Sequence, residues 1–454
     1  MWSKRHAKIL SEYFQELEKS NIRFFIIRNY EGLPDKNTSK DVDIILKYGT
    51  VKAAERILKD VFRRNGLSYF YRVIIEECYV HYAINKKGDF AIHIDLMNGY
   101  INRGVELFTF EELYSQTIDY NGFRVLNELY NGVMLFIYKQ FGYRKPKLKE
   151  VYKSTIYDVW LRYPEFSSIL EKMLGKDIYP KISACIEQKD FDTMLSYSSI
   201  VSQRLRQYSN QTSFVKNQYR RIRFITQKVN RIIFRYRKYE KSFSVMAPDG
   251  TGKTTFLTQL LNRLAFLYVD APNDIKRFHL YHFRPSLFPN LGAVGEKARV
   301  MKQDTDFTNP HRAKPAGFLS SLIRITYYWF DYVLGWMYYT RRDVQYDLYT
   351  VYDRYSYDLL VDPRRTRLKL PYWVRRCFVA CMPHPKINFF LKASPDVIIK
   401  RKAELTHNEI TRQVSAYERL SVRKNIITVD AVRCMDEMID EALPHLLSAY
   451  WEKL

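Results

Sequence analysis

The sequence predicts an α/β protein whose C-terminal half forms a five-stranded parallel sheet with helices on both faces. Three observations support this fold class. After residue 241, apolar runs of strand type alternate with helical segments, a pattern typical of parallel sheets. Residues 1–120 alternate helix and strand signals on a smaller scale, which indicates an α+β domain. The chain has 454 residues and is 46% hydrophobic, which is enough for two or three domains.

The N-terminal half divides into three regions. Residues 1–120 form the predicted α+β domain. Its signals are one helix and three short strands, at Ser3 to Lys19, Phe24 to Arg28, Val42 to Leu46 and Phe90 to Leu96. Residues 121–215 carry apolar clusters and few turn signals, so we expect a helical region there. Residues 216–241 are strongly basic, and their apolar residues recur at helical spacing, so we expect a linker helix.

The C-terminal domain is expected over residues 242–454. Its predicted strands are Phe243 to Met246, Phe278 to Phe283, Leu348 to Tyr352, Ile387 to Leu391 and Ile426 to Val429. The most apolar stretch of the chain runs from Ser321 to Tyr339. Because Arg324 and Asp331 lie near its centre, we expect a buried helix there and no membrane span.

Charge and cysteine content limit the classes of partner. The net charge of +24 indicates anionic partners, such as nucleotides, nucleic acid or an acidic membrane surface. In residues 216–241 cations flank an apolar stripe, so we expect either weak peripheral contact with the inner face of a membrane or packing on the protein. The basic stripe lacks aromatic–glycine RNA motifs, so no specific nucleic-acid binding is expected. The five cysteines are scattered without metal-site spacing, which favours a reduced, cytoplasmic protein. Separately, we expect a homodimer.

A phosphate-binding loop stands at the start of the C-terminal domain. Residues 247–254 fit the pattern GxxxxGK[ST] except at Ala247, after a strand-like run and before a helix expected from Thr255 to Leu264. Glycines let N–H groups turn toward phosphate oxygens, Lys253 reaches the β- and γ-phosphates, Thr254 holds Mg²⁺, and the helix start adds positive charge. We therefore expect ATP and Mg²⁺ as cofactors. The expected binding residues are Ala247, Asp249, Gly250, Thr251, Gly252, Lys253, Thr254 and Thr255.

The loop from Met246 to Thr255 resembles that of thymidylate kinases, in which an acidic residue is followed by glycine. Three further segments resemble the same family. They are the Asp-Arg-Tyr sequence that starts at Asp353, the stretch from Ser394 to Lys402 that leads into the lid, and Val429-Asp430-Ala431 before the last helix. The resemblance covers roughly residues 242–450 and implies a P-loop kinase fold.

This resemblance implies roles for individual residues. Asp353 would orient Mg²⁺ through water, Arg354 would hold the acceptor phosphate, and Asp249 would contact the acceptor sugar. Arg284 resembles the arginine of the family's Phe-Pro-x-Arg segment, which also binds the acceptor phosphate, and Arg401 would bring positive charge from the lid. Phosphoryl transfer depends mainly on positioning and positive charge. The expected catalytic set is therefore Lys253, Asp353, Arg354 and Arg401.

The acceptor pocket departs from the family pattern. Tyr332 stands where the family has the arginine that reads thymine, although Trp329, Phe330 and Tyr332 could still stack on a ring. The segment from Arg284 to Phe318 is long and rich in proline and histidine, including residues 310–315. We expect a nucleoside monophosphate acceptor with weak base selection, or a sugar or glycan. The second expectation arises because the domain also resembles kinase-like proteins from bacterial surface-polysaccharide gene clusters.

The N-terminal domain carries its own carboxylates. Asp41 and Asp43 lie on one face of a predicted strand because side chains alternate, and Asp95 lies on another strand. Three carboxylates on adjacent strands can hold Mg²⁺ for nucleotidyl transfer, and the arrangement resembles polymerase-β-type nucleotidyltransferases. Arg28-Asn29 stands where that family has Gly-Ser. An Mg²⁺ site at Asp41, Asp43 and Asp95 and a degenerate domain with an acidic edge both remain open.

Three functions are consistent with these features. The leading hypothesis is an ATP-dependent phosphotransferase of the thymidylate-kinase type that acts on a dTMP-like acceptor, preceded by a nucleotidyltransferase-like domain. The second is a bifunctional protein that modifies a sugar or surface polysaccharide. The third is a membrane- or nucleic-acid-associated scaffold whose P-loop only switches conformation. ATP consumption with dTMP, with sugars or with neither would separate the three.

Overall fold

The computed structural model describes residues 2–138, 140–141, 147–270, 275–289, 316–402 and 405–454. They form two compact units. The first comprises Met1–Gln227 with Leu267–Val269 and Lys453–Leu454, and the second comprises Lys228–Phe266 with Asp270–Glu452. The second unit thus begins within the segment that the sequence predicted to be a linker.

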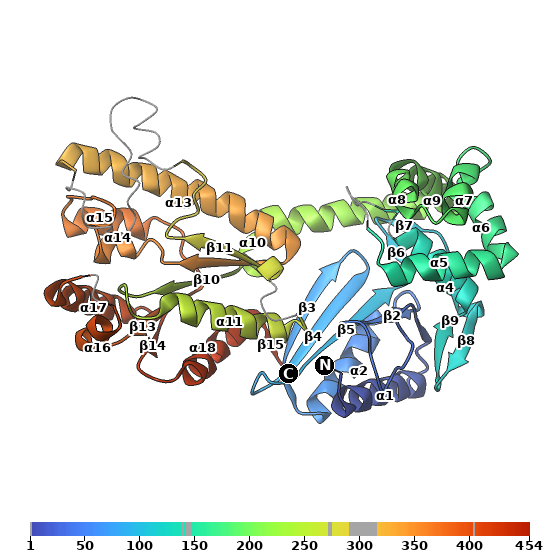
Figure 1. Cartoon of the computed structure of the whole chain (residues 1–454), viewed down its shortest axis with the longest axis horizontal. Helices are drawn as coiled ribbons and strands as arrows, with labels where there is room; N and C mark the ends of the chain where they lie inside the picture. Colours follow the sequence, from blue (N-terminus) through green and yellow to red (C-terminus); the bar gives the residue numbers. More distant parts are fainter. Residues whose placement is uncertain (1, 139, 142–146, 271–274, 290–315, 403–404) are drawn as a thin grey trace. The chain divides into compact units, whose positions relative to one another are not determined.

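The first unit opens with an α+β region (Figure 1). Its elements are α1 (Lys4–Lys19), β1 (Phe24–Ile26), β2 (Val42–Leu46), α2 (Val51–Arg64), β3 (Leu67–Ile75), β4 (Cys78–Asn85), β5 (Ala91–Asn98), β6 (Ile101–Asn102), β7 (Val105–Glu106), α3 (Phe110–Ser115), β8 (Thr117–Tyr120) and β9 (Phe123–Leu126). From β3 to β8 the main sheet runs in the order β3-β4-β5-β2-β1-β9-β8. β2 and β5 are parallel, with Asp43 beside Asp95.

The predicted strand from Phe24 to Arg28 ends earlier than expected. β1 stops at Ile26, and Arg28 and Asn29 take left-handed conformations with φ of 43° and 53°. A left-handed backbone cannot continue a β-ladder, so the chain turns away from the sheet. The side chain of Arg28 therefore does not follow the alternation of side chains between the two faces of the sheet.

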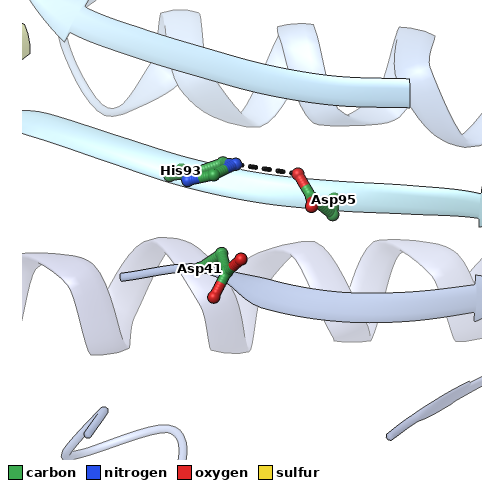
Figure 2. Close-up of side chains that lie close together, drawn as sticks. All are labelled: Asp41, His93 and Asp95. Carbon is green, nitrogen blue, oxygen red and sulfur yellow. Dashed lines mark hydrogen bonds and ion pairs between the residues drawn. The ribbon is translucent and has the colours of Figure 1, made fainter. Parts of the chain in front are cut away.

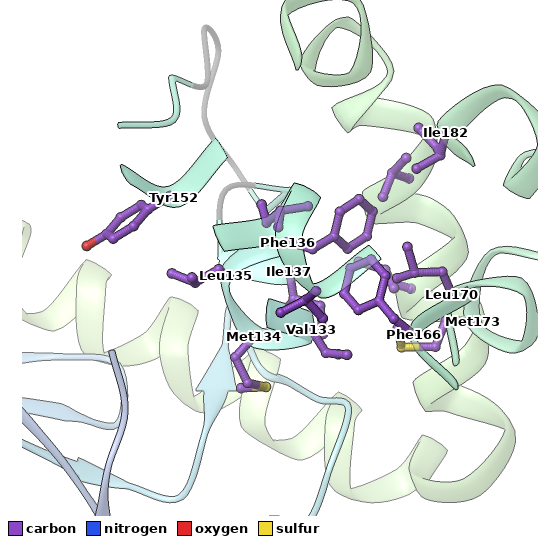
Figure 3. Packing of buried hydrophobic residues seen from close by; sticks show 14 of the residues in the cluster. Val133, Met134, Leu135, Phe136, Ile137, Tyr152, Phe166, Leu170, Met173 and Ile182 are labelled. Atoms are coloured by element: carbon purple, nitrogen blue, oxygen red, sulfur yellow. The ribbon is translucent and has the colours of Figure 1, made fainter. Parts of the chain in front are cut away.

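A helical region follows the sheet, but it begins at Glu128 and not at residue 121 as predicted, because Phe123–Leu126 form strand β9. Its elements are α4 (Glu128–Tyr138), α5 (Glu150–Arg162), α6 (Pro164–Leu174), α7 (Tyr179–Glu187), α8 (Phe191–Ser196) and α9 (Ser198–Val229). Figure 3 shows the apolar side chains of α4, α5, α6 and α7 packed together. The same core includes Phe25 of β1 and Ile45 of β2, so the helices cover one face of the sheet. α1 and α2 cover the other face through Ile26, Ile44 and their neighbours.

The predicted linker helix over 216–241 differs from the structure. α9 begins at Ser198, has a non-helical residue at Ser213 and ends at Val229. A π-helical turn (Asn230–Phe234) and α10 (Tyr236–Tyr239) follow it, and Lys241 is already in a strand. Within the first unit α9 is held by an ion pair from Arg220 to Glu106, 2.8 Å long.

The second unit contains the predicted five-stranded parallel sheet. Its strands are β10 (Lys241–Met246), β11 (Phe278–His282), β12 (Tyr349–Asp353), β13 (Ile387–Lys392) and β14 (Ile426–Asp430), in the order β11-β12-β10-β13-β14. Between them come α11 (Lys253–Leu267), a 3₁₀ turn (Ile275–Arg277), α13 (Phe318–Tyr346), α14 (Asp358–Val361), α15 (Tyr372–Ala380), α16 (Pro395–Arg401) and α17 (His407–Ser421). α18 (Met435–Tyr450) and the two-residue strand β15 (Glu452–Lys453) end the chain.

Both faces of this sheet are covered by helices (Figure 1). On one face, Met246, Tyr352 and Phe390 share a core with residues of α13, α14, α15 and α17. On the other, Phe389 packs edge-on against Phe256 of α11. The stretch from Ser321 to Tyr339 lies in α13, but it is buried on one face only, because Ile323 and Tyr338 are exposed. No helix of the described residues has the length and apolar character of a membrane span. The proline- and histidine-rich residues 310–315 lie outside the described residues.

Candidate functional site

The predicted phosphate-binding loop joins the end of β10 to the start of α11. β10 lies between β12 and β13 and is parallel to both, so its carboxyl end opens next to theirs. In the register with β12, Val245 is beside Asp353. The backbone N–H of Arg354 donates to the carbonyl of Val245 at 2.9 Å, which fixes the end of β12 against the start of the loop. Parallel strands therefore bring the loop and Asp353 to one edge of the sheet.

Two glycines shape the loop. Gly250 and Gly252 have φ of 84° and 99°, a region that side chains make costly. A Cβ on Gly250 would lie 3.2 Å from Lys402, whereas a Cβ on Gly252 would meet no described atom within 4 Å. Ala247, the departure from the motif, is fully buried, and Thr251 donates its hydroxyl to the carbonyl of Pro248 at 2.9 Å. The open space beside Gly252 suits the close approach of phosphate oxygens.

Lys253 lies at the start of α11 and folds back over the loop. Its Nζ donates to the carbonyls of Ala247 and Pro248, each at 3.2 Å, and lies 3.5 Å from Oδ1 of Asp249. Burial lowers the pKa of Lys253 to about 8, and the nearby guanidinium of Arg354 acts in the same direction. The ammonium group is therefore poorly compensated in this structure, and phosphate oxygens would stabilise its charged form.

Asp249 is bound by two arginines. Arg354, which is only 2% exposed, donates to Asp249 through Nη2 and to Asp358 through Nη1, the latter at 2.7 Å. Arg365 also pairs with Asp249 and approaches Asp362 with its Nε at 3.4 Å. Burial would raise the pKa of Asp249, but Arg354, Lys253 and Arg365 outweigh it and hold that pKa far below its ordinary value. Asp249 is therefore a carboxylate on which three cations converge.

The two carboxylate oxygens of Asp353 have different surroundings. Its Oδ2 lies 3.1 Å from Nδ1 of His282, while its buried Oδ1 has no hydrogen-bond partner among the described residues. Burial would raise the pKa of Asp353, but His282 and Lys253 outweigh it and lower the pKa. Thr254 and Thr255 are exposed in the first turn of α11. A buried, ionised oxygen without a partner fits the expected Mg²⁺ or its coordinated water.

Two other predicted residues, Arg284 and Tyr332, form hydrogen bonds within the protein. Arg284 donates to Oδ2 of Asp331 at 2.7 Å, and Asp331 also accepts from the backbone of Ser286 and Phe288. Tyr332 is fully buried and donates its hydroxyl to the carbonyl of Phe283 at 2.6 Å, so its ring packs in the core. Arg284 and Tyr332 thus hold the segment that follows β11.

Arg401 lies at the end of α16 and donates to two backbone carbonyls. Nη1 reaches Thr251 at 3.2 Å and Nη2 reaches Ala431 at 3.0 Å. Its guanidinium therefore links the phosphate-binding loop to the end of β14. In this structure Arg401 therefore stabilises the loop through a backbone carbonyl.

Sequence reasoning missed Arg365 and His282. Arg365 follows the Asp-Arg-Tyr segment by a dozen residues in a run of basic residues, and no motif spacing distinguishes it from Arg364 or Arg367. His282 ends β11, and the adjacent parallel strand places it beside Asp353. Parallel pairing of the predicted strands 278–283 and 348–352 could have found His282, because His282 is next to the end of the first and Asp353 directly follows the second.

A second group of chemically active side chains lies in the first unit. Asp41, immediately before β2, and His93 and Asp95 on β5 each offer one ligand atom, and these atoms lie within 4.8 Å of one another. Figure 2 shows His93 and Asp95 on one strand with the carboxylate of Asp41 on the neighbouring chain segment. His93 Nε2 and Asp95 Oδ1 are 2.8 Å apart. Burial would lower the pKa of His93, but Asp95 and Asp41 outweigh it and raise the pKa.

Asp43 lies on the same face of the sheet but forms a salt bridge with Arg28. Nε and Nη2 of Arg28 donate to its two oxygens at 2.7 and 3.1 Å. Burial, with Asp41 and Asp95 nearby, raises the pKa of Asp43 although Arg28 opposes this. The structure thus brings His93 into the group predicted as Asp41, Asp43 and Asp95, and it ties Asp43 to Arg28.

Comparison with known proteins identifies no family for this chain. No protein-family model matches the chain, and no curated protein matches its sequence. Among solved structures, a thymidylate kinase from Ehrlichia chaffeensis aligns with 46% of this chain and 98% of its own length, at 13% sequence identity and a TM-score of 0.30. A likeness of that size assigns no activity to this protein.

Proposed function

We propose that the second unit is an ATP–Mg²⁺-dependent phosphotransferase whose acceptor is a phosphorylated small molecule such as a nucleoside monophosphate. The observation that carries this proposal is the edge where β10 and β12 end. There, Lys253 lies near Asp353, which keeps one buried oxygen without a described partner. Cations around a loop of free N–H groups, next to an acid for Mg²⁺, are the main requirements of phosphoryl transfer.

In the proposed reaction the loop N–H groups and Lys253 hold the β- and γ-phosphates of ATP. Thr254 and Asp353 hold Mg²⁺, which would neutralise charge that develops on the transferred group. Lys253 keeps its position through the carbonyls of Ala247 and Pro248 until nucleotide binds. The protein's contribution is then chiefly preorganised positive charge, which is usually the largest catalytic effect.

The acceptor is suggested by the two arginines at Asp249. Arg354 and Arg365 come from different segments, and both guanidinium groups reach the same carboxylate. Two convergent guanidinium groups bind an acceptor phosphate well, because each offers paired N–H donors. Each arginine keeps a second acid, Asp358 for Arg354 and Asp362 for Arg365, which would hold it in place when a ligand contacts it. The hydroxyl of Tyr332 donates to the carbonyl of Phe283, so base selection would come from other residues.

The test is ADP formation by the full chain with Mg²⁺ and ATP. The acceptors are dTMP, dUMP, dCMP and dGMP, followed by sugar phosphates and free sugars, each compared with a reaction that has no acceptor. We expect phosphoryl transfer to a phosphorylated acceptor with less than tenfold preference among the four bases, since the arginine expected for thymine is replaced by buried Tyr332. Exclusive use of dTMP would contradict the weak base selection. Transfer to free sugars alone would contradict the role of Arg354 and Arg365.

A further inference from the structure

The group formed by Asp41, His93 and Asp95 has the dimensions of a metal site. Its three ligand atoms lie within 4.8 Å of one another. Protein ligands held ~2.1 Å from one ion lie about 3–4 Å apart, so small side-chain rotations would bring all three onto a common ion. The three residues lie on two neighbouring parallel strands or next to them. Asp41 directly precedes β2, and β2 pairs with β5 from Val42 and Ile94 onward. The backbone therefore holds the group together.

Charge favours a cation at this place. The same face of the sheet carries three carboxylates, from Asp41, Asp43 and Asp95, and Arg28 pairs with Asp43. His93 Nε2 lies 2.8 Å from Oδ1 of Asp95, so a metal ion bound by both would replace the hydrogen bond between them. Asp95 and His93 are 8% and 9% exposed. Carboxylates in such a position cost free energy unless a positive group compensates them. Asp41 and Asp95 are thus two acids that face one space, and an added cation would bind both.

Arg28 limits the number of ions. Both oxygens of Asp43 accept hydrogen bonds from Arg28, and the guanidinium lies over the ring of Tyr138 at 4.1 Å. Its backbone is left-handed, with φ of 43°, which aims the side chain back toward β2. The side chain of Arg28 is only 13% exposed, so it is a fixed part of the group. With Asp43 occupied in this way, the carboxylates can hold one ion but cannot bridge two.

The ligand types select the class of ion. Mg²⁺ prefers an all-oxygen octahedral set and loses its waters reluctantly. One imidazole with two carboxylates suits Mn²⁺, Fe²⁺ or Zn²⁺ better. We propose that Asp41, His93 and Asp95 bind one divalent first-row transition-metal ion, and that Arg28 takes the place of a second cation beside Asp43. This site is separate from the nucleotide site proposed in the second unit, and it does not depend on that proposal.

The test is Mn²⁺ binding to the full chain after removal of metals with a chelator, without nucleotide, followed by electron paramagnetic resonance of free Mn²⁺. We expect one Mn²⁺ per chain. Asp41→Asn and His93→Asn should each weaken binding by about tenfold or more, since changes to residues that only support a metal ligand already cost 10–100-fold. Asp119→Asn, an exposed acid on β8, and Thr254→Ala in the phosphate-binding loop are the controls and should leave affinity unchanged.

Asp41→Asn is the mildest of these variants, because among the described residues its carboxylate accepts only from Ser39, at 2.6 Å. It keeps the test interpretable if His93→Asn fails to fold. Mg²⁺ should displace Mn²⁺ only in large excess. The proposal is overturned by absence of Mn²⁺ binding, by binding that both ligand variants retain, or by loss of binding in Thr254→Ala. It is also overturned by two Mn²⁺ per chain lost together, or by displacement at equal Mg²⁺ concentration.

Discussion

The phosphate-binding loop of the second unit and the acidic group of the first unit (Asp41, Asp43, His93 and Asp95) both lie where parallel strands run side by side, yet they are built differently. In the loop, the backbone does most of the positioning, through the left-handed glycines Gly250 and Gly252 and through the register of β10 with β12. In the acidic group, side chains hold one another, as Arg28 holds Asp43. The two sites also differ in what they leave free. Asp353 keeps a buried oxygen without a described partner, whereas both oxygens of Asp43 are bound.

This difference determines how each site should respond to change. A site made by backbone conformation tolerates replacement of its side chains without unfolding, so function and stability can be separated. A site made by a buried ion pair loses stability when one partner is removed, because the other is left as an uncompensated charge. Mutations of matched size in the two sites therefore test whether the comparison holds.

The largest effect is expected from Arg28→Met. This change removes the guanidinium and leaves Asp43 buried near Asp41 and Asp95. We expect the first unit to lose about 3–5 kcal/mol of stability, as in other buried ion pairs that lose one partner. Because the pKa of Asp43 is already raised, it takes up a proton as pH falls, and the loss should be smaller at pH 5 than at pH 8. Hydrogen exchange of β1 and β2, compared with that of β10, measures the first unit separately.

The control for that experiment is the double variant Arg28→Met with Asp43→Asn. Removal of both charges should recover most of the lost stability, since no carboxylate is then left without its partner. If the single variant exchanges like the native protein in β1 and β2, the ion pair does not hold this region, and the contrast between the two sites fails.

The next largest effect is expected from Lys253→Ala in the loop. Removal of its ammonium should lower the rate of phosphoryl transfer by about 100- to 1,000-fold, the usual cost of losing one preorganised group that stabilises the transition state. Its hydrogen bonds to Ala247 and Pro248 are to carbonyls of the same loop, so the fold should remain. Initial rates with ATP and the best acceptor measure the loss, and exposed Lys424→Ala is the matched control. Native rates in Lys253→Ala would remove the loop from the mechanism.

The contrast between the sites also explains which features the sequence could predict. The five strands of the second unit and the loop were predicted, because an apolar run, two glycines and a lysine are local in the sequence. The ion pair of Arg28 with Asp43 was not predicted. It depends on a left-handed backbone at Arg28, and no glycine at that position indicates such a conformation in the sequence. The same holds for the β3–β4 hairpin. Its turn at Glu76 has φ of 58° without the Asn-Gly signal that such turns usually carry.

Residues expected in the acceptor pocket show the same limit. Tyr332 was expected there from a resemblance, and its burial depends on how α13 packs on β12, which local pattern does not encode. Arg284 was expected to be available, but Asp331, from α13, binds it. Arg365 was overlooked because nothing near it in the sequence indicates that it reaches Asp249. Contacts between distant segments are thus the part of the site that the structure supplies.

A smaller effect is expected from alanine at the two loop glycines. Both positions are left-handed, which costs an alanine about 1–3 kcal/mol. At Gly250 the new methyl group would also lie 3.2 Å from Lys402, while at Gly252 it would meet no described atom within 4 Å. We therefore expect Gly250→Ala to destabilise the second unit more than Gly252→Ala. Chemical denaturation compares the two. Equal losses would mean that the contact with Lys402 adds nothing, and no loss at either position would mean that the left-handed conformations do not constrain this loop.

The smallest effect is expected from Tyr332→Phe, which separates a residue of the core from a residue of the site. The hydroxyl of Tyr332 donates to the carbonyl of Phe283 at 2.6 Å, and the ring packs edge-on against Tyr355 with centroids 4.9 Å apart. Loss of one buried hydrogen bond should cost about 1 kcal/mol, while the aromatic packing remains. The KM for the acceptor should stay within twofold of the native value, because the hydroxyl and the ring of Tyr332 are both engaged by other residues of the core. A large rise in KM without loss of stability would instead place Tyr332 in the pocket and mean that α13 moves when the acceptor binds.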